Sequence, residues 1–498
     1  MRKRLEFVGG SSAKFWEIDV SGARHTVRFG RLGTDGQSKV KAFADAVAAK
    51  VDADKLVAEK LKKGYRAAKS APAGRAAPAT AKAAAKPRAP VQTRTAKAQT
   101  RAAKVHTKAV AAAPTGTAAS AAAVARVIAG AAGKTPLAKL ESLELELPRG
   151  ATLEPLLACK ALRDLTIRGG ALPDLAPLAR LPRLTELTLF RGTSAQSLAG
   201  LAAAASIKKL TLGAAKVPPT LLAGLAMPKL EQLIVYGRIG APRYLAGLTG
   251  LQSLTLRANT ARSDLADLAP LASLRELRHL DITGAPVRSL RPLAGLRLRG
   301  IHLAGCSALR SLEGLERSTG LTYVDASYSK VEDLSALGGM RDLEELNLRG
   351  APVKDLSPIL GATSLQRLYV EKTKVTSLAG LDRMRKLEIL WAWDIRVTDL
   401  TMLQGLPLLR MLDIPTLKSP SWDFLGTLKS LEHLDLMMTN VPANIAGLLL
   451  GLPKLTKVRL AKTAVPRDHK DAKKLDAILR KRKGGVSFDA SRRWSWTM

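Results

Sequence analysis

Glycine and arginine recur in one short segment near the N-terminus. Residues 25–37 read HTVRFGRLGTDGQ, in which Gly30, Gly33 and Gly36 are three residues apart and Arg28 and Arg31 lie beside them. Such a segment could hold a phosphate, cover a cofactor or turn a β-hairpin. A P-loop requires Lys-Ser or Lys-Thr after its last glycine, and a dinucleotide fingerprint requires G-x-G-x-x-G. Neither pattern is present, so we interpret Gly33 and Gly36 as turn residues.

A second group of reactive residue types lies in the middle of the chain. Asp281, His302 and Asp325 follow one another at spacings of 21 and 23 residues, and Ser327 comes shortly after. His with two carboxylates could bind a metal, and with the serine it could form a hydrolytic triad. The segment lacks a nucleophile elbow and an oxyanion hole. We therefore favour an ion-paired histidine, and we expect no metal, no cofactor and no enzymatic activity.

Two further histidines are interpreted as solvated residues, and both cysteines are interpreted as structural residues. His279 and His433 are expected to face solvent. Cys159 and Cys306 are the only cysteines of the 498-residue chain, so neither a disulfide framework nor a four-cysteine metal site is available. This usage is typical of a reducing compartment, and the absence of a signal-like apolar segment favours a soluble cytoplasmic protein.

The charge of the chain narrows the class of partner. Its 79 Lys and Arg residues outnumber 42 Asp and Glu residues, which gives a net charge of +37. A chain this basic favours anionic partners. Its length exceeds what one hydrophobic core usually serves. Composition then divides it into three regions, which we predict to be residues 1–66, 67–136 and 137–498.

Residues 1–66 have the pattern of a small antiparallel sheet covered by a helix. Short alternating apolar runs over residues 5–8, 14–20 and 26–32 are separated by glycine-containing turns. Residues 44–63 then carry apolar side chains at helical spacing, and Gly64 follows at a typical capping position. The unit holds fifteen Lys and Arg residues against eight acids.

The same stretch resembles a WGR domain, the module found in poly(ADP-ribose) polymerases and many bacterial proteins. The resemblance covers about residues 2–66 and includes Trp16, Phe29-Gly30-Arg31 in place of Trp-Gly-Arg, Phe43-Ala44 and the closing Lys62-Lys63-Gly64-Tyr65. It implies DNA binding near a strand end, with Phe29 and Arg31 in the roles of the triplet Trp and Arg. The change from Trp to Phe keeps an aromatic face but removes the indole donor. Nothing in the chain resembles the polymerase catalytic domain.

The basic residues around the triplet form the predicted nucleic-acid surface. We expect contacts from six residues on or beside the two strands that flank the loop: Arg28, Phe29, Gly30, Arg31, Lys39 and Lys41. The alternative is a solvated basic face of a small domain. Phosphate contacts of this kind carry no sequence specificity, and DNA and RNA are both open.

Residues 67–136 form an Ala-, Lys- and Pro-rich linker with twelve Lys and Arg residues and no acids. Such a composition cannot bury enough apolar surface to fold, so we expect disorder up to about residue 117 and added phosphate binding. Its last part, ASAAAVARVIAGAAG, could form a helix. Two adjacent basic elements make nucleic acid the leading partner.

The rest of the chain repeats one apolar frame. Leu-x-x-Leu-x-Leu begins at fifteen positions with a mean spacing of 22.5 residues, namely 140, 162, 184, 207, 230, 251, 277, 298, 321, 343, 365, 387, 409, 431 and 455. This period is typical of leucine-rich repeats and resembles the internalin-like class. The overall fold class is therefore α/β: a WGR-like unit, a basic linker and a solenoid with a parallel concave sheet.

Large side chains gather on the predicted concave face. One column of positions between the leucines contains Asp281, His302, Asp325, Asn347, Tyr369, Trp391, Asp413 and Asp435. We expect a protein partner to contact six residues in and beside this column: Tyr323, Arg349, Arg367, Tyr369, Trp391 and Trp393. The alternative is that these side chains only cover the sheet.

The C-terminal segment is expected to close the solenoid. A basic helix precedes Val486-Ser-Phe488, which could form a last strand, while Arg492, Arg493, Trp494 and Trp496 could instead contact nucleic acid. Together these patterns predict a non-enzymatic adaptor, cytoplasmic and nucleoid-associated, that joins nucleic acid to a protein partner. The alternative is a protein-interaction scaffold without a nucleic-acid role. We predict no membrane segment, and the oligomeric state is open.

Overall fold

A computed structural model of the chain resolves two compact units, residues 1–100 and 101–498, which are described separately. In the first unit it describes residues 2–9, 12–21, 24–31, 37–42, 52–53, 56–57 and 66–67. In the second it describes residues 121–490 except 148–150, 170, 173, 191–193, 196–197, 218–224, 226, 240–241 and 258–264. The predicted linker up to residue 120, the loop around Gly33 and Gly36, and the C-terminal Trp and Arg residues lie outside these ranges.

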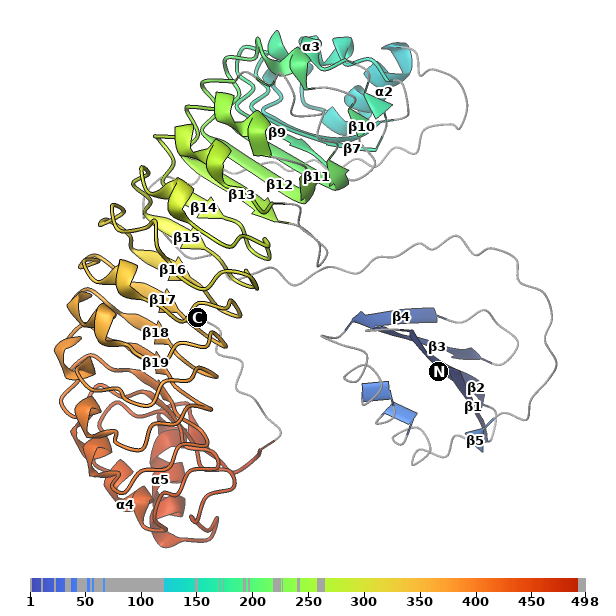
Figure 1. Cartoon of the computed structure of the whole chain (residues 1–498). Helices are drawn as coiled ribbons and strands as arrows, with labels where there is room; N and C mark the ends of the chain where they lie inside the picture. The colour runs from blue at the N-terminus through green and yellow to red at the C-terminus, as the bar shows by residue number, and fades with distance from the viewer. Residues whose placement is uncertain are drawn as a thin grey trace. The chain divides into compact units, whose positions relative to one another are not determined.

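The N-terminal unit contains a five-stranded antiparallel sheet with strand order β4-β3-β2-β1-β5 (Figure 1). Its strands are β1 (Arg2–Gly9), β2 (Ser12–Ser21), β3 (Arg24–Arg31), β4 (Gln37–Ala42) and β5 (Arg66–Ala67). Residues 52–53 and 56–57 are helical. Trp16 and Ile18 pack with Ala53 and Val57 of these helical pieces, so the predicted sheet with a covering helix is confirmed over the described residues.

The second unit is a curved stack of repeats with one continuous parallel sheet (Figure 1). Over the described residues the sheet has sixteen strands, one for each of the fifteen leucine frames and one at the C-terminal end. They are β6 (Ser142–Glu146), β7 (Asp164–Arg168), β9 (Glu186–Leu189), β11 (Lys209–Val217), β12 (Gln232–Ile239), β13 (Ser253–Arg257), β14 (His279–Asp281), β15 (Gly300–His302), β16 (Tyr323–Asp325), β17 (Glu345–Asn347), β18 (Arg367–Tyr369), β19 (Ile389–Trp391), β20 (Met411–Asp413), β21 (His433–Asp435), β22 (Lys457–Arg459) and β23 (Gly485–Ser487).

Short helical turns line the side of the stack opposite the sheet (Figure 1). They include α3 (Ala176–Ala179) and α4 (Ile445–Leu449), and the 3-10 turns η1 (Leu137–Lys139), η2 (Glu154–Ala158), η3 (Ala199–Leu201), η4 (Pro242–Gly247), η5 (Ala269–Ser273), η6 (Arg291–Leu293), η7 (Ser335–Leu337), η8 (Ser357–Gly361), η9 (Leu381–Arg383), η10 (Thr401–Leu403) and η11 (Asp423–Thr427). A second small parallel pair joins β8 (Ala171–Leu172) to β10 (Ser194–Ala195).

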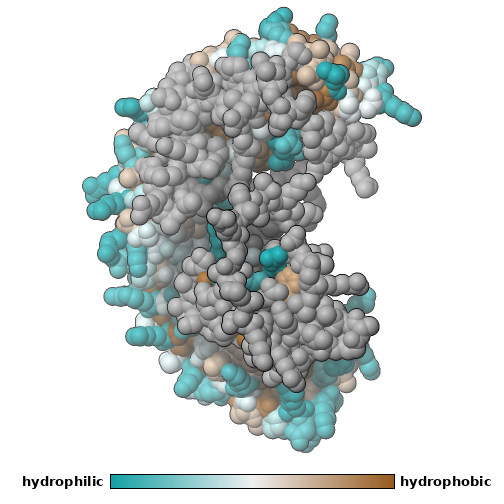
Figure 2. Space-filling view, turned by 90° about the vertical axis from the view of Figure 1, so that its right-hand side faces the viewer, coloured by the Kyte–Doolittle hydropathy of each residue, from teal (hydrophilic) through white to brown (hydrophobic). Residues whose placement is uncertain are grey.

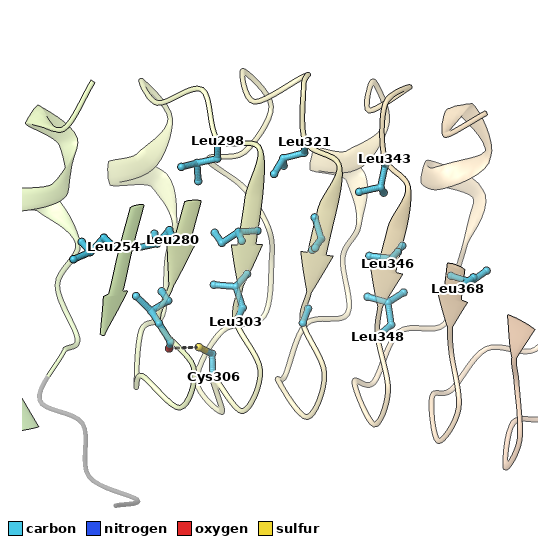
Figure 3. Packing of buried hydrophobic residues seen from close by; sticks show 14 of the residues in the cluster. Leu254, Leu280, Leu298, Leu303, Cys306, Leu321, Leu343, Leu346, Leu348 and Leu368 are labelled. Atoms are coloured by element: carbon cyan, nitrogen blue, oxygen red, sulfur yellow. Dashed lines mark hydrogen bonds between the residues drawn. The ribbon is translucent and has the colours of Figure 1, made fainter. Parts of the chain in front are cut away.

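The frame leucines form the core between the sheet and the turns. Described residues at the outer margin of Figure 2 are mostly hydrophilic, whereas the leucines of successive frames stack inside the solenoid in Figure 3. Leu298, Leu321 and Leu343 are each at most 1% exposed. The thiol of Cys306 donates to the carbonyl of Ile282 at 3.4 Å, and Cys159 is fully buried. Both cysteines are structural, as the sequence predicts.

In each of the nine repeats that begin at Leu277 or later, one turn position takes the left-handed conformation. It lies seven residues after the start of the frame, and φ is between +54° and +76° at Gly284, Gly305, Tyr328, Gly350, Lys372, Asp394, Thr416, Met438 and Lys462. Glycine tolerates this conformation, whereas a β-branched residue such as Thr416 is strained in it. The side chains at this position become larger toward the C-terminal half, where the turns border the concave face.

The two ends of the core are covered by helices. At the N-terminal end α2 (Ala121–Ala132) buries Val124 and Ile128 completely against η2 and β6. The helix lies in the last part of the predicted linker, where the sequence could form a helix. At the other end α5 (Lys470–Lys481) packs on β23, which includes the predicted closing residue Val486. No helix among the described residues is long and apolar enough to cross a membrane.

Candidate nucleic-acid and partner-binding surfaces

Phe29 of the Phe-Gly-Arg triplet belongs to the small core of the N-terminal unit. It lies directly opposite Trp16 in the β2–β3 pair and packs, partly buried, against the cluster of Trp16, Ile18, Ala53 and Val57. Phe29 therefore contributes to the fold of this unit and is only partly buried.

Arg28 lies on the other side of the same sheet, because successive residues of a strand point to opposite faces. Its guanidinium carbon is 5.6 Å from the centroid of the Phe15 ring. Glu17, which is 5% exposed, is its direct cross-strand neighbour. Arg28 and Phe29 are thus not brought onto one continuous surface.

Lys41 is held at the surface by a carboxylate. Its Nζ lies 2.9 Å from Oδ1 of Asp52, and the Nε2 of the buried His25 lies 2.7 Å from Oδ2 of the same carboxylate. Hydrogen bonds from His25 and Lys41 hold the pKa of Asp52 below its usual value. The Lys41 side chain is still 58% exposed. The contact ties the covering helix to the sheet and leaves the ammonium group accessible.

The backbone register places the remaining triplet residues and Lys39 in the same sheet. Gly30 lies opposite Phe15 and Arg31 opposite Lys14, while Lys39 pairs with Val27 of β3. The predicted residues are therefore gathered on β3 and β4, next to the segment 32–36.

On the solenoid, the column that starts at Asp281 contributes to the turns that follow its strands. Several of its members cap the turn that follows the strand: the side chains of Asp281, Asp325, Asn347 and Asp435 each accept from the backbone N–H two residues later, at 2.9–3.1 Å. Asp281 and Asp435 are only 7% and 5% exposed. These two carboxylates are largely buried and stabilise the turns.

The groups considered for metal binding or hydrolysis are used in other contacts. Asp281 accepts from Nε of Arg257 at 2.7 Å, and the His302 ring lies 4.5 Å from the Tyr323 ring. Within the described ranges no group of three His, Cys, Asp or Glu residues could hold a metal ion. The carboxylates that we expected to pair with His302 instead bind Arg257 and the backbone N–H of Ser327.

Trp391 and Trp393 line a pocket of about 560 Å³ in the C-terminal half of the sheet. Two arginines and three acids share it with the aromatic rings. The lining residues are Arg349, Glu371, Trp391, Trp393, Asp413, Pro415, Thr416, Asp435, Met437, Arg459 and Ala490. An apolar wall with a few convergent polar groups is the usual form of a recognition site.

Trp391 is anchored by a small apolar cluster on this face. Its ring meets Tyr369 edge-on with centroids 4.9 Å apart, and it packs against Tyr369, Ile389 and Met411. Tyr369 itself is 6% exposed, and its burial raises the pKa of the phenol. Of this pair, Trp391 presents the accessible ring, and its buried indole Nε1 has no hydrogen-bond partner among the described residues.

Arg349 is held between aromatic rings and an acid. Its Nε lies 3.5 Å from Oε1 of Glu371, and its guanidinium carbon lies 5.4 Å from the Tyr328 ring and 5.8 Å from the Trp393 ring. Lys372 Nζ lies 4.9 Å from the same Trp393 ring. Two cations thus contact the Trp393 ring and stabilise its position.

The other two predicted partner residues lie nearer the middle of the solenoid. Arg367 donates to Glu345 at 2.7 Å, and both residues are partly buried. Tyr323 donates to Asp325 at 3.5 Å, and burial raises the pKa of its phenol. They are not among the residues that line the tryptophan pocket.

Arg459, Thr416 and Lys372 were not singled out from the sequence. Arg459 is 5% exposed, and it donates to Asp435 at 2.8 Å and to the carbonyl of Ala490 at 3.1 Å. It continues the column of Trp391 and Asp413 into the last frame, so the repeat alignment contained the signal. Thr416 and Lys372 could have been found at the turn position that holds glycine in other repeats.

Comparison with known proteins identifies the N-terminal unit. Residues 1–72 match the WGR domain family. Protein YehF of Escherichia coli K12 is 46% identical over 54 residues, which are 11% of this chain and 20% of YehF. The uncharacterized protein YfeS of the same organism is 38% identical over 66 residues, which are 13% of this chain and 27% of YfeS. The chain thus spans between a fifth and just over a quarter of the length of these relatives.

Comparison with solved structures concerns the solenoid. A leucine-rich-repeat protein of Leptospira interrogans aligns at 18% identity and a TM-score of 0.56, covering 70% of this chain and 90% of that one. An internalin, InlF of Listeria monocytogenes, aligns at 20% identity and a TM-score of 0.49, covering 74% of this chain and 95% of that one. Similarity at this level shows the fold alone. The chain therefore carries an N-terminal WGR domain followed by a leucine-rich-repeat solenoid.

Proposed function

We propose that the chain is a non-enzymatic adaptor: the WGR domain and basic linker bind nucleic acid, most readily DNA, and the concave face of the solenoid binds a protein partner. Neither domain family is catalytic. The observation that carries the nucleic-acid role is the WGR domain itself, followed by twelve Lys and Arg residues without an acid in residues 67–136. Binding through phosphates is independent of sequence. A cytoplasmic, nucleoid-associated location follows from such a partner.

The domain boundaries proposed for this division of labour are residues 1–66, 67–136 and 137–498, and α2 at the end of the second segment packs on the solenoid core. Within the first, Arg28, Phe29, Gly30, Arg31, Lys39 and Lys41 are the proposed nucleic-acid contacts. Two observations support this assignment. The Phe29 ring is only partly buried, and the Lys41 side chain is 58% exposed. Arg28 would contact a different side of the ligand, since it lies on the opposite face of the sheet from Phe29.

The proposed partner site is the tryptophan pocket. Trp391, Trp393 and Arg349 are residue types that dominate protein interfaces, and each is held in place by neighbours before any partner binds. Such ordering lowers the entropic cost of association. Tyr323, Arg367 and Tyr369 would support this surface.

The nucleic-acid role is tested with the full chain and a labelled 20-base-pair duplex. Phe29→Leu keeps apolar packing on Trp16 but removes the aromatic face, so Phe29→Leu with Arg31→Ala should weaken binding several-fold. Lys82→Ala in the linker is the control and should change affinity less than twofold. Equal effects of the two variants would contradict a specific role of the triplet.

The partner role is tested by co-purification after nuclease treatment. A protein retained by the intact chain and lost on Trp391→Ala with Trp393→Ala supports the concave site. Leu408→Ala, at a leucine that is 46% exposed, is the matched control. Retention by the double variant would contradict the proposed site.

A further inference from the structure

The second position of the leucine frame forms a column at the edge of the parallel sheet, here called the edge column. It consists of Glu141, Arg163, Thr185, Lys208, Glu231, Gln252, Arg278, Arg299, Thr322, Glu344, Gln366, Glu388, Arg410, Glu432 and Thr456. The backbone N–H of Arg299 donates to the carbonyl of Arg278 at 2.7 Å, and that of Thr322 donates to Arg299 at 2.9 Å. Successive members are therefore neighbours about 4.8 Å apart across the sheet.

Cations elsewhere in this column have an acidic neighbour. Lys208 Nζ lies 2.7 Å from Glu231, and Arg410 lies 3.2 Å from Glu388 and 3.6 Å from Glu432. Opposite charges at adjacent positions of a sheet stabilise it, whereas like charges destabilise it. The sequence of the column follows this rule through most of the solenoid.

Arg278 and Arg299 break the rule. They are adjacent in the edge column, and Thr322 on the far side of Arg299 offers no charge. Arg278 binds Glu276 at 3.2 Å. In residues 265–490, which are described throughout, the Arg299 side chain has neither a hydrogen bond nor an ion pair. The pKa of the neighbouring His279 is lowered mainly by burial and further by the positive charge of Arg299 and by His302.

The two arginines open onto a depression of about 810 Å³ between the repeats that begin at Leu277, Leu298 and Leu321. Four arginines and one glutamate line it: Arg278, Arg297, Arg299, Arg317 and Glu316, together with Gly295, Leu298, Thr319 and Gly320. The Glu316 carboxylate accepts from the N–H of Gly314 at 2.9 Å, which fixes it on the backbone. Over residues 265–490 the side chains of Arg297 and Arg317 also make no hydrogen bond or ion pair.

We propose that this arginine depression binds consecutive phosphates of a polynucleotide backbone, which gives the solenoid a nucleic-acid contact of its own. The exposed guanidinium groups of Arg297, Arg299 and Arg317 would bind one small anion weakly, because solvent and salt screen each contact between an arginine and the anion. A polyanion presents several phosphates at once and releases counterions when it binds. The lining contains no aromatic residue on which a base could stack, so the contact would be to the backbone and independent of sequence.

This contact rests on the proposed nucleic-acid role of the chain. It extends that role to the solenoid, the domain to which we also assign the protein partner. With nucleic acid also held by the WGR domain and linker, the second contact would act at high effective concentration. Arg297→Gln, Arg299→Gln and Arg317→Gln remove three charges and leave shorter, neutral polar side chains. The matched control is Arg383→Gln, Arg385→Gln and Arg396→Gln, which removes three exposed arginines elsewhere on the solenoid.

The test measures duplex binding by the full chain between 50 and 300 mM salt. The 297/299/317 variant should lower the slope of log affinity against log salt by about two to three, and the control by less than one. A second readout is arginine modification by phenylglyoxal, followed by mass spectrometry. Duplex DNA should protect Arg297, Arg299 and Arg317 at least threefold and leave Arg383 and Arg385 unchanged.

The outcomes separate this inference from the proposed function. If the intact chain does not bind the duplex at 50 mM salt, both are overturned. If it binds but the two triple variants behave alike and the depression is not protected, only the arginine site is overturned. Protection by inorganic tripolyphosphate and not by DNA would reassign the depression to a free oligophosphate and contradict the polynucleotide contact.

Discussion

The guanidinium carbon of Arg349 lies 5.8 Å from the centroid of the Trp393 ring, although the two residues belong to frames separated by a third. Glu371, which is 1% exposed, lies in the intervening frame and contacts Arg349. The three residues occupy one position of successive repeats. The concave pocket is therefore assembled across repeats, and each member depends on the register of the whole stack.

Trp391→Ala should lower the free energy of unfolding of the solenoid by about 2 kcal/mol, because the substitution removes the edge contact with Tyr369 and opens the Ile389–Met411 cluster. Urea unfolding followed by far-ultraviolet circular dichroism measures this change. Leu408→Ala, at an exposed leucine, should change stability by less than about 0.5 kcal/mol. Equal effects of the two substitutions would contradict the packing described for Trp391.

Arg459→Met should destabilise the C-terminal repeats by about 3 kcal/mol. Both side chains of the Arg459–Asp435 pair are at most 7% exposed, so the variant leaves a buried carboxylate without its principal cation. Adding Asp435→Asn removes the charge but keeps an oxygen that can accept from the N–H of Met437. In urea unfolding, the double variant should regain at least half of the free energy of unfolding that Arg459→Met alone loses. A double variant as unstable as Arg459→Met would show that the buried charge is not the cause.

Gly350→Ala should lower the free energy of unfolding by about 2 kcal/mol. The residue has φ +69°, and an added Cβ would lie 2.9 Å from Cδ1 of Tyr328. Gly339→Ala is the matched control, since its Cβ would meet no atom within 4 Å. Thermal unfolding should show a lower Tm for Gly350→Ala alone. An unchanged Tm would mean that the turn accommodates a side chain, as it does at Lys372 and Thr416.

Cys306 should resist alkylation in the folded protein at pH 8. Burial raises the pKa of its thiol to about 12, so the reactive thiolate forms only when the pH rises toward that value. Iodoacetamide labelling read by mass spectrometry should therefore stay below a tenth of the protein at pH 8 and become complete in 6 M guanidinium chloride. Rapid labelling of the folded chain would contradict the buried position of Cys306 under the Ile282 carbonyl.

The leucine frames predicted the solenoid because their spacing is set by the repeat itself: every start from Leu140 to Leu455 holds a strand of the parallel sheet. The same frames could not separate open positions from buried ones on the concave face. Asp281 and Asp435 were expected to point outward, but their carboxylates cap turns. That role depends on backbone geometry after the strand, which the apolar period does not encode.

The N-terminal surface shows a comparable limit. Strand alternation places Arg28 and Phe29 on opposite faces of the sheet, although both were assigned to one predicted nucleic-acid surface. The contact of Lys41 with Asp52 and His25 joins residues up to 27 positions apart, and only the packing of the covering helix on the sheet brings them together.

The central claim is that the chain holds nucleic acid through its N-terminal basic elements. The most direct measurement is fluorescence anisotropy of a labelled duplex titrated with the full chain at several salt concentrations between 50 and 300 mM. We predict dissociation constants near or below 1 μM at 50 mM salt and a log–log slope steeper than about −4, because several phosphates are contacted at once. No saturable binding at 50 mM salt, or affinity that does not change with salt, would contradict the account.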